Sequence, residues 1–249
     1  MKIAVLLKRV PDTGISLRVN PDGSDILQEG VAYVTNPYDE YGLEEAVRIK
    51  ERSPEAEVVA ISLGPDEAQD VLRNALAIGA DRAILLKSPD YRWLDPLSSA
   101  SILAEALKAE SPDLILVGKQ AVDDNAYAVP AYIAHSLGLP IVSYAIRIDL
   151  SGSEALVTRE TDWGTEKVKV SLPCVITCEK GLNEPRLPAL RGIMAAKKKP
   201  IDVKDVSGSP VFGRPSLALP PQKQAGVKVQ KEFPQDVDDL VSFLREKIL

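Results

Sequence analysis

Apolar residues in the first half of the chain gather in short continuous runs, which longer amphipathic stretches separate. The runs are KIAVLLK (2–8), EVVAISLG (57–64), RAILLK (82–87) and DLILVG (113–118). Continuous runs of this length are typical of strands in a parallel sheet that helices cover on both faces. The intervening stretches carry apolar residues at helical spacing, so the pattern predicts right-handed βαβ units of a doubly wound α/β sheet.

Two of the expected helices carry clear start signals. Asn36 is suited to an N-cap with Pro37 at the first helical position, and Asp95 with Pro96 repeats this arrangement. A further helix is expected over PAYIAHSLG (130–138), which contains the only histidine, His135. Because no positioned partner for acid–base chemistry is apparent beside it, we interpret His135 as a surface or packed helix residue.

The alternation of strand and helix patterns stops after residue 150. The segments EALVTRETD, EKVKVSL and CVITCEK follow one another there without an intervening helix. The stretch DWGTE between the first two is typical of a hairpin turn, so we expect the sheet to gain antiparallel strands here. Cys174 and Cys178 fall on one face of the last segment. We expect two small buried residues there, because metal-binding cysteines are spaced differently.

Proline, lysine and small residues dominate from about Asn183 onward, and these stretches are poor candidates for a compact core. We therefore predict an α/β domain over residues 1–185 and a C-terminal arm over residues 186–249. The arm ends in DVDDLVSFLREKIL, which predicts an amphipathic helix. Its apolar stripe consists of Val237, Leu240, Val241, Leu244 and Ile248. The arm offers nothing to cover this stripe, so the core or a partner must do so.

Composition and charge narrow the classes of function. The chain has 249 residues, 45% of them hydrophobic, and a formal net charge of -6 with a pI near 5.1. A nucleic-acid binder would present a basic surface, so we expect no nucleic-acid partner. No apolar run approaches the roughly 20 residues that span a bilayer, and the N-terminal stretch lacks the cleavage region of a secretory signal. A cytoplasmic location without a transmembrane segment is expected.

The loop GKQAVDDNAYAVP (118–130) is the strongest candidate site, because it is longer than the roughly two to six residues of a typical βα connection. Pro130 suits the first helical position and disfavours a helical Val129, so we expect a late helix start. The NH groups of residues 125–129, Ala131 and Tyr132 would then be free to bind an anion. Asp123 and Asp124 would repel phosphate, so we expect them to cap loop amides or accept ribose hydroxyls, which favours a nucleotide.

Three more loops lie beyond carboxyl ends of the expected strands, where open α/β sheets bind ligands. They are KRVPDTG (8–14), TNPYDE (35–40) and SLGPDE (62–67), and ordinary turn chemistry is the alternative for each. The dinucleotide fingerprint GxGxxG is absent after the first strand. A nucleophile in a catalytic context and a metal-spaced cluster are also absent from the sequence, which argues against an enzyme with its own catalytic residues.

The segment RLPALRGIMAAKKKP (186–200) places apolar side chains among proline, arginine and lysine. It could be a strap that lies on its own domain or an exposed docking loop, and the residues alone favour the strap. The run Lys197–Lys199 is most simply a solvated charge cluster.

Several of these segments together resemble the β subunit of electron-transfer flavoproteins, including the nitrogen-fixation type. The resemblance rests on KRVPDTG, NPYDEYGLEEAVRIKE, NALAIGADRAILL, DLILVGKQAVDD, LPCVITCEKGLNEPR and RGIMAAKKKP, which follow one another in order over roughly residues 1–200. Each segment would be weak evidence alone, but their succession is specific. The resemblance implies an adenine nucleotide α-hydrolase-like sheet and an electron carrier.

The resemblance further implies a heterodimer with an α subunit that holds most of an FAD, while this chain binds its own nucleotide over residues 1–185. That nucleotide is AMP in ordinary members and a second FAD, reduced by NADH, in electron-bifurcating relatives. Tyr38 would lie toward the flavin of the α subunit. The implied cofactor-binding residues are Leu6, Asn36, Pro37, Tyr38, Asp39, Leu63, Gly64, Gly118, Lys119, Gln120, Ala121, Val122, Asp123, Asp124, Asn125, Ala126, Tyr127, Ala128 and Val129.

The resemblance also implies that dehydrogenases dock on residues 186–194, here named the recognition segment, and that a quinone-reducing acceptor takes the electrons onward. Leu190 matches the leucine that the family inserts into its partner, which reverses the preference for a strap. The implied partner-binding residues are Arg186, Leu187, Pro188, Ala189, Leu190, Arg191, Gly192, Ile193 and Met194.

One departure from the family pattern lies in the candidate loop. Ala128, Val129 and Pro130 stand where the family commonly has Gln, then Thr or Val, then Gly, so a hydroxyl and one NH group of the expected phosphate cradle are missing. The main hypothesis is an electron carrier with AMP in this chain. The alternatives are an NADH-dependent bifurcating subunit with a second FAD, and a stand-alone module that senses adenine nucleotides.

Overall fold

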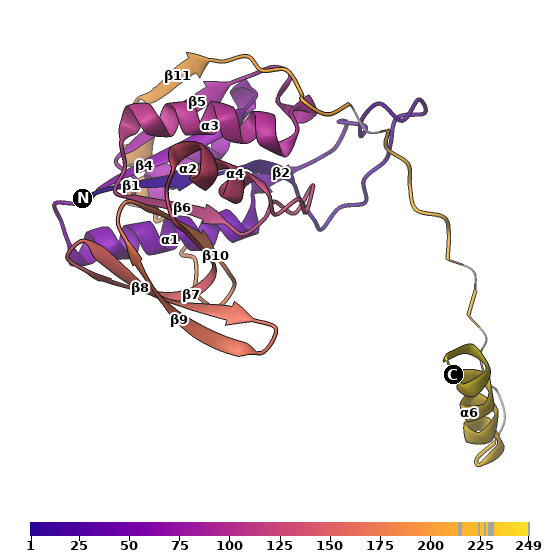
Figure 1. Cartoon of the computed structure of the whole chain (residues 1–249). Helices are drawn as coiled ribbons and strands as arrows, with labels where there is room; N and C mark the ends of the chain where they lie inside the picture. The colour runs from indigo at the N-terminus through magenta and orange to yellow at the C-terminus, as the bar shows by residue number, and fades with distance from the viewer. Residues whose placement is uncertain (214–215, 224, 227, 229–231, 249) are drawn as a thin grey trace.

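The computed structural model describes residues 1–249 except 214–215, 224, 227, 229–231 and 249. Among the described residues, nine strands form one sheet in the order β11-β5-β4-β1-β6-β10-β7-β8-β9 (Figure 1). Neighbouring strands from β11 to β7 run parallel, and β7, β8 and β9 are joined as antiparallel hairpins. The predicted α/β class with a mainly parallel sheet is confirmed.

The elements have the following bounds. The strands of the sheet are β1 (Lys2–Leu6), β4 (Glu57–Gly64), β5 (Arg82–Lys87), β6 (Leu114–Gly118), β7 (Ile141–Ser151), β8 (Glu154–Thr161), β9 (Gly164–Ser171), β10 (Cys174–Cys178) and β11 (Ile201–Asp205), while β2 (Arg9–Pro11) and β3 (Tyr33–Thr35) form a separate antiparallel ribbon. The helices are α1 (Pro37–Arg52), α2 (Gln69–Ile78), α3 (Pro96–Glu110), α4 (Val129–Leu137), α5 (Leu190–Ala196) and α6 (Gln235–Ile248), with 3₁₀ turns η1 (Asp66–Ala68) and η2 (Tyr91–Trp93).

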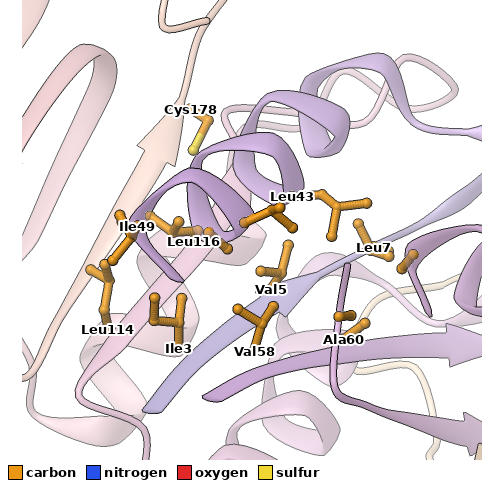
Figure 2. Packing of buried hydrophobic residues seen from close by; sticks show 14 of the residues in the cluster. Ile3, Val5, Leu7, Leu43, Ile49, Val58, Ala60, Leu114, Leu116 and Cys178 are labelled. Carbon is orange, nitrogen blue, oxygen red and sulfur yellow. The ribbon is translucent and has the colours of Figure 1, made fainter. Parts of the chain in front are cut away.

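Helices cover both faces of the parallel part of the sheet, so its strands are buried on both sides. Ile3 and Val5 of β1 belong to the core beneath α1 and α2, and Figure 2 shows them close to Leu43 and Ile49 of α1. The intervening residue Ala4 belongs to the opposite core beneath α3 and α4. This alternation explains why the strands appear in the sequence as continuous apolar runs.

The order of the strands reverses at β1. The chain passes from β1 to β4 and β5 on one side, and then returns through α3 to β6 on the other side. In doubly wound sheets a crevice opens outside the carboxyl ends of the two strands at such a switch point, and ligands bind there. The ends of β1 and β6 carry Lys8 and the loop after Gly118, so the fold places the candidate loop at this crevice.

One strand runs in a direction that the sequence pattern did not predict. The segment CVITC was grouped with the antiparallel strands, but β10 lies parallel to both β6 and β7. All five of its residues are buried, as expected of a strand with both faces covered. The other two segments, β8 and β9, do form the expected hairpin, and Cys174 and Cys178 are buried free thiols as expected.

Residues 190–205, which the sequence pattern assigned to the arm as a poor candidate for a compact core, pack against the α/β domain. Helix α5 packs on α2, its last residue Ala196 is fully buried, and Arg73 donates hydrogen bonds to the carbonyl oxygens of Ala196 and Lys199 at 2.6 Å each. Strand β11 then pairs with β5 and forms the edge of the sheet. Helix α5 has only seven residues and β11 only five, so neither is long enough for its pattern to stand out among the surrounding prolines and lysines. The predicted boundary at residue 185, between the α/β domain and the arm, therefore stays a prediction.

The last part of the arm contains the expected helix, α6, which stands apart from the sheet in Figure 1. Its side chains at Val237, Leu240, Val241 and Leu244 are between 41% and 47% exposed, while the side chain of Ile248 lies outside the described residues. The described part of this chain thus leaves these four side chains of the apolar stripe uncovered. None of the helices in the described ranges combines the length and apolar character required to cross a membrane.

Candidate functional site

Asn36 fixes the candidate loop at the switch point. It occupies the N-cap position of α1, but its side chain makes no capping hydrogen bond, which corrects the expected role. Its Nδ2 instead donates to the carbonyl oxygen of Gln120 at 2.8 Å, and its Oδ1 accepts from the backbone NH of Val122 at 3.1 Å. The backbone NH groups of Asp39 and Glu40 donate to the carbonyl oxygen of Asn36 at 2.9 and 3.3 Å, so the first turn is held by the backbone and the Asn36 amide can hold the loop.

Asp39 joins the carboxyl ends of the two strands at the switch point. Its carboxylate accepts from the backbone NH of Lys8 after β1 at 2.7 Å and from that of Gly118 in β6 at 3.0 Å. Burial raises the pKa of Asp39 to about 7, outweighing the two backbone donors and the nearby Lys8 charge. A Cβ added at Gly118 would lie 2.7 Å from the Cβ of Tyr38, so only glycine allows this close approach.

Lys8 pairs with the two aspartates that seemed to exclude a phosphate and balances one of their two negative charges. Its Nζ lies 2.8 Å from Asp123 and 3.0 Å from Asp124. Burial lowers the pKa of Lys8, but both carboxylates raise it further, so the net direction is upward. Asp124 also accepts from the backbone NH of Ala126 at 3.0 Å, which confirms the expected loop cap. Contact of either aspartate with a ribose stays a prediction.

The loop offers fewer free NH groups than the sequence predicted. Asn125 donates its backbone NH to the carbonyl oxygen of Ala121, and Asn125 and Tyr127 have φ values of 50° and 56°. Helix α4 begins at Val129, so the expectation of an extended Val129 is wrong; Ala128 already has helical dihedral angles. Tyr132 donates to the carbonyl oxygen of Ala128. Within the described residues, the backbone NH groups of Tyr127, Ala128, Val129 and Ala131 have no hydrogen-bond partner.

A buried polar atom beside these NH groups also lacks a partner. Gln120 donates from Nε2 to Oδ1 of Asn125 at 2.6 Å, while its Oε1 is buried without a hydrogen bond in the described part of the chain. Leu6 belongs to the core cluster beneath α3 and α4, and Leu63 and Val129 pack against the same cluster. Gly64 ends β4, where an added Cβ would lie 2.9 Å from Ala68.

Aromatic rings surround Lys119 at the end of β6. Its Nζ pairs with Glu179 and lies 4.8 Å from the ring centre of Tyr38 and 5.6 Å from that of Tyr144. Tyr144 has a φ of 62°, and its backbone NH is held by the hydroxyl of Thr177 at 2.9 Å. Lys119 and Tyr38 were predicted site residues. Tyr144 and Glu179 were missed, because their proximity depends on β7 and β10 lying side by side.

The recognition segment is held in place by Arg186 and by the close packing of α5, while its apolar side chains are exposed to solvent. Arg186 forms ion pairs with Glu44 at 2.8 Å and with Glu51 at 2.5 Å, both on α1. An added Cβ at Gly192 would collide with the carbonyl oxygen of Ala77, which shows how closely α5 lies on α2. Leu187 is 90% exposed and Leu190 is 75% exposed. The segment therefore combines the fixed backbone of a strap with the free side chains of a docking loop.

The remaining residues of the recognition segment range from exposed to half-buried. Met194, Arg191 and Ala189 are exposed, Ile193 is 39% exposed, and Pro188 is half-buried. Across the described residues, no group of three or more histidine, cysteine, aspartate or glutamate side chains could hold a metal ion. The contacts of all these residues with a nucleotide or a partner protein stay predictions.

Comparison with known proteins places the chain in a family. The model of the electron transfer flavoprotein domain matches residues 25–209. The chain is 40% identical to the electron transfer flavoprotein subunit beta of Syntrophomonas wolfei over 93% of this chain and 91% of the relative. It is 40% identical to the subunit of the same name from Sus scrofa and 39% identical to that from Homo sapiens, each over 99% of this chain and 97% of the relative. The chain therefore belongs to the electron transfer flavoprotein family, as a β subunit.

Proposed function

We propose that the chain is one half of a heterodimeric electron carrier, which accepts electrons from dehydrogenases and passes them on through FAD at the interface with an α subunit. The recognition segment carries this proposal. Its backbone is fixed through Arg186 and Gly192, while Leu187 and Leu190 extend into solvent. Exposed apolar side chains on a rigid backbone are suited to docking a partner protein.

The α subunit is proposed to cover the apolar stripe of α6. Val237, Leu240, Val241 and Leu244 are all more than 40% exposed, and the described part of this chain brings no element against them. A helix with such a stripe gains stability when a second surface buries it. A stand-alone nucleotide-sensing module would leave the stripe in water, so the heterodimer is the better explanation.

The loop at the switch point is proposed to hold an adenine nucleotide. The unpartnered NH groups of Tyr127, Ala128 and Val129 would bind a phosphate, helped by the positive end of α4. The buried Oε1 of Gln120 would accept a hydrogen bond from a donor on the nucleotide. Asn36 and Asp39 would support the nucleotide site indirectly. The Asn36 side chain holds the loop, and the Asp39 side chain holds the ends of β1 and β6. These features fit the expected group.

AMP is the proposed occupant, in preference to a second FAD. The loop presents a single short row of NH groups, and the cations Lys8 and Lys119 are already paired, Lys8 with Asp123 and Asp124 and Lys119 with Glu179. Such a row suits one phosphate better than a diphosphate, because a diphosphate site commonly adds a cationic group or a longer row of NH groups. FAD bound mainly by the α subunit would supply the redox chemistry, and Tyr38 and Lys119 would border it from this chain.

Co-purification with the α subunit tests both parts of the proposal. The heterodimer is expected to show a flavin absorption spectrum that a reduced dehydrogenase bleaches. Nucleotides released by denaturation and counted by chromatography should be one FAD and one AMP per heterodimer. Two FAD would establish the bifurcating alternative, and a colourless heterodimer that no dehydrogenase reduces would refute the electron carrier.

A further inference from the structure

A cavity lies between helices α1 and α2 and the first residues of the recognition segment. Its volume is about 130 Å³, and residues 185–188 form one wall. Leu43 of α1, Ile78 of α2 and Pro188 contribute apolar surface to the walls. Nucleotide and cofactor sites usually enclose about 300 Å³ or more, so this cavity has the size for the end of one long side chain rather than for a cofactor.

Two polar side chains in this cavity lack partners. Glu40 on α1 is half-buried, and within the described residues no cation or hydrogen-bond donor meets its carboxylate. Burial alone raises the pKa of Glu40, which shows that its charged form is left uncompensated. Asn74 on α2 also lines the cavity, and its amide has no hydrogen-bond partner in the described part of the chain. The cavity thus offers a carboxylate and an amide oxygen as acceptors.

The other charges around the cavity neutralise one another. Arg186 binds Glu44 and Glu51, and Glu44 also binds Arg48 at 2.6 Å. Two guanidinium groups therefore balance two carboxylates, and the carboxylate of Glu40 remains as the net charge of the cavity. A cation that reached Glu40 would form its ion pair partly shielded from bulk water, where such pairs are stronger than at a fully exposed surface.

We propose that this cavity receives the ammonium or guanidinium group of a lysine or arginine from the dehydrogenase that docks on the recognition segment. The apolar walls would contact the alkyl part of that side chain, while Glu40 and Asn74 accept hydrogen bonds from its charged end. Leu187 lines the cavity and is also 90% exposed, so the cavity opens directly beside the apolar docking surface. This inference rests on the proposed electron carrier and adds the charge that its partner must present.

A titration without any dehydrogenase tests the cavity itself. The probe is N-acetyl-arginine amide, added to the heterodimer with ¹³C-labelled glutamate carboxyls, and its matched control is N-acetyl-citrulline amide, which has the same shape without the charge. The arginine probe is expected to shift the Glu40 resonance saturably and to lower its pKa, while the citrulline probe does not. Equal responses to the two probes, or no shift of the resonance that disappears in the Glu40→Gln variant, would overturn the proposal.

Steady-state kinetics then test the role in docking. With a dehydrogenase that reduces the heterodimer, Glu40→Gln is expected to raise KM for the heterodimer about five- to tenfold at low salt, and the difference should shrink as salt increases. The control Glu55→Gln removes the same charge from an exposed residue beyond the other end of α1. Equal KM values for the two variants would refute the docking role. If no dehydrogenase reduces the heterodimer, the electron carrier is refuted, while the probe titration still decides the cavity.

Discussion

Replacing Asp39 by asparagine should change the pH dependence of stability. The pKa of Asp39 is about 7 in the folded chain, against an ordinary value of 3.8, because the carboxyl is buried. Between these two pH values the folded chain keeps a proton that the unfolded chain has released. Proton linkage then requires the free energy of unfolding of the wild-type chain to fall as the pH rises from about 4 to about 7.

The magnitude follows from the two pKa values. Each pH unit of this interval corresponds to about 1.36 kcal/mol, so ionising Asp39 costs the wild-type chain up to about 4 kcal/mol by pH 8. An asparagine amide cannot ionise, but it offers one acceptor where Asp39 accepts from both Lys8 and Gly118. Leaving one buried NH group unpaired costs about 1–3 kcal/mol at every pH. By pH 5 ionisation has already cost the wild-type chain about 1.6 kcal/mol, so the two proteins should be similar in stability there. At pH 8 the variant should be the more stable by about 1–3 kcal/mol.

Urea unfolding of the purified chain, followed by far-UV circular dichroism at pH 5, 6, 7 and 8, measures this difference. The comparison is valid where the dependence of the free energy on urea is the same for both proteins. A difference between variant and wild type that stays constant from pH 5 to pH 8 would refute the reasoning. It would show that Asp39 is already ionised at pH 5 and that its hydrogen bonds outweigh its burial.

Three further substitutions test the loop, the helix α5 and the docking surface. Gly118→Ala should destabilise the chain by about 1–3 kcal/mol and reduce the nucleotide recovered on denaturation, because the new Cβ meets Tyr38 and Asp39; unchanged stability and nucleotide content would contradict the close approach. Gly192→Ala should lower the melting temperature, because the new Cβ collides with Ala77. This effect should outweigh the helix propensity of alanine, which favours the variant by about 1 kcal/mol. A more stable variant would show that α5 does not pack closely on α2. Leu190→Ala should slow electron transfer from a dehydrogenase about tenfold with flavin content unchanged, and Leu156→Ala on β8 serves as its control. Altered flavin content in the Leu190 variant would favour the strap.

The sequence predicted those parts of the fold that depend on local pattern. The four continuous apolar runs correspond to β1, β4, β5 and β6, and Asp95 caps α3 through a hydrogen bond from the backbone NH of Ser98 at 2.9 Å. It did not predict the direction of β10, because a buried strand has the same pattern whichever way its neighbours run. It also did not predict β11, where only the first of five residues, Ile201, is even partly buried.

The candidate site shows the same limit. The loop after β6 was identified from its length and from Pro130, both of which are local features. The roles of its residues depend on contacts between distant segments. Lys8 binds Asp123 and Asp124, which lie more than a hundred residues further along the chain. The side chain of Asn36 binds the loop and does not cap α1. A lysine directly after the first strand was the one signal that could have suggested a partner for the two aspartates.

The recognition segment is tethered at both ends to one sheet, through β10 on one side and β11 on the other. A segment held in this way has little conformational entropy left to lose when a protein docks on it. A small apolar contact is then enough for recognition, and a small contact also allows rapid dissociation, which an electron carrier requires between successive partners. In the proposed complex, the pairing of β11 with β5 would thus influence the lifetime although β11 makes none of the docking contacts. A substitution that loosens this edge strand would shorten that lifetime while every residue of the docking surface stayed the same.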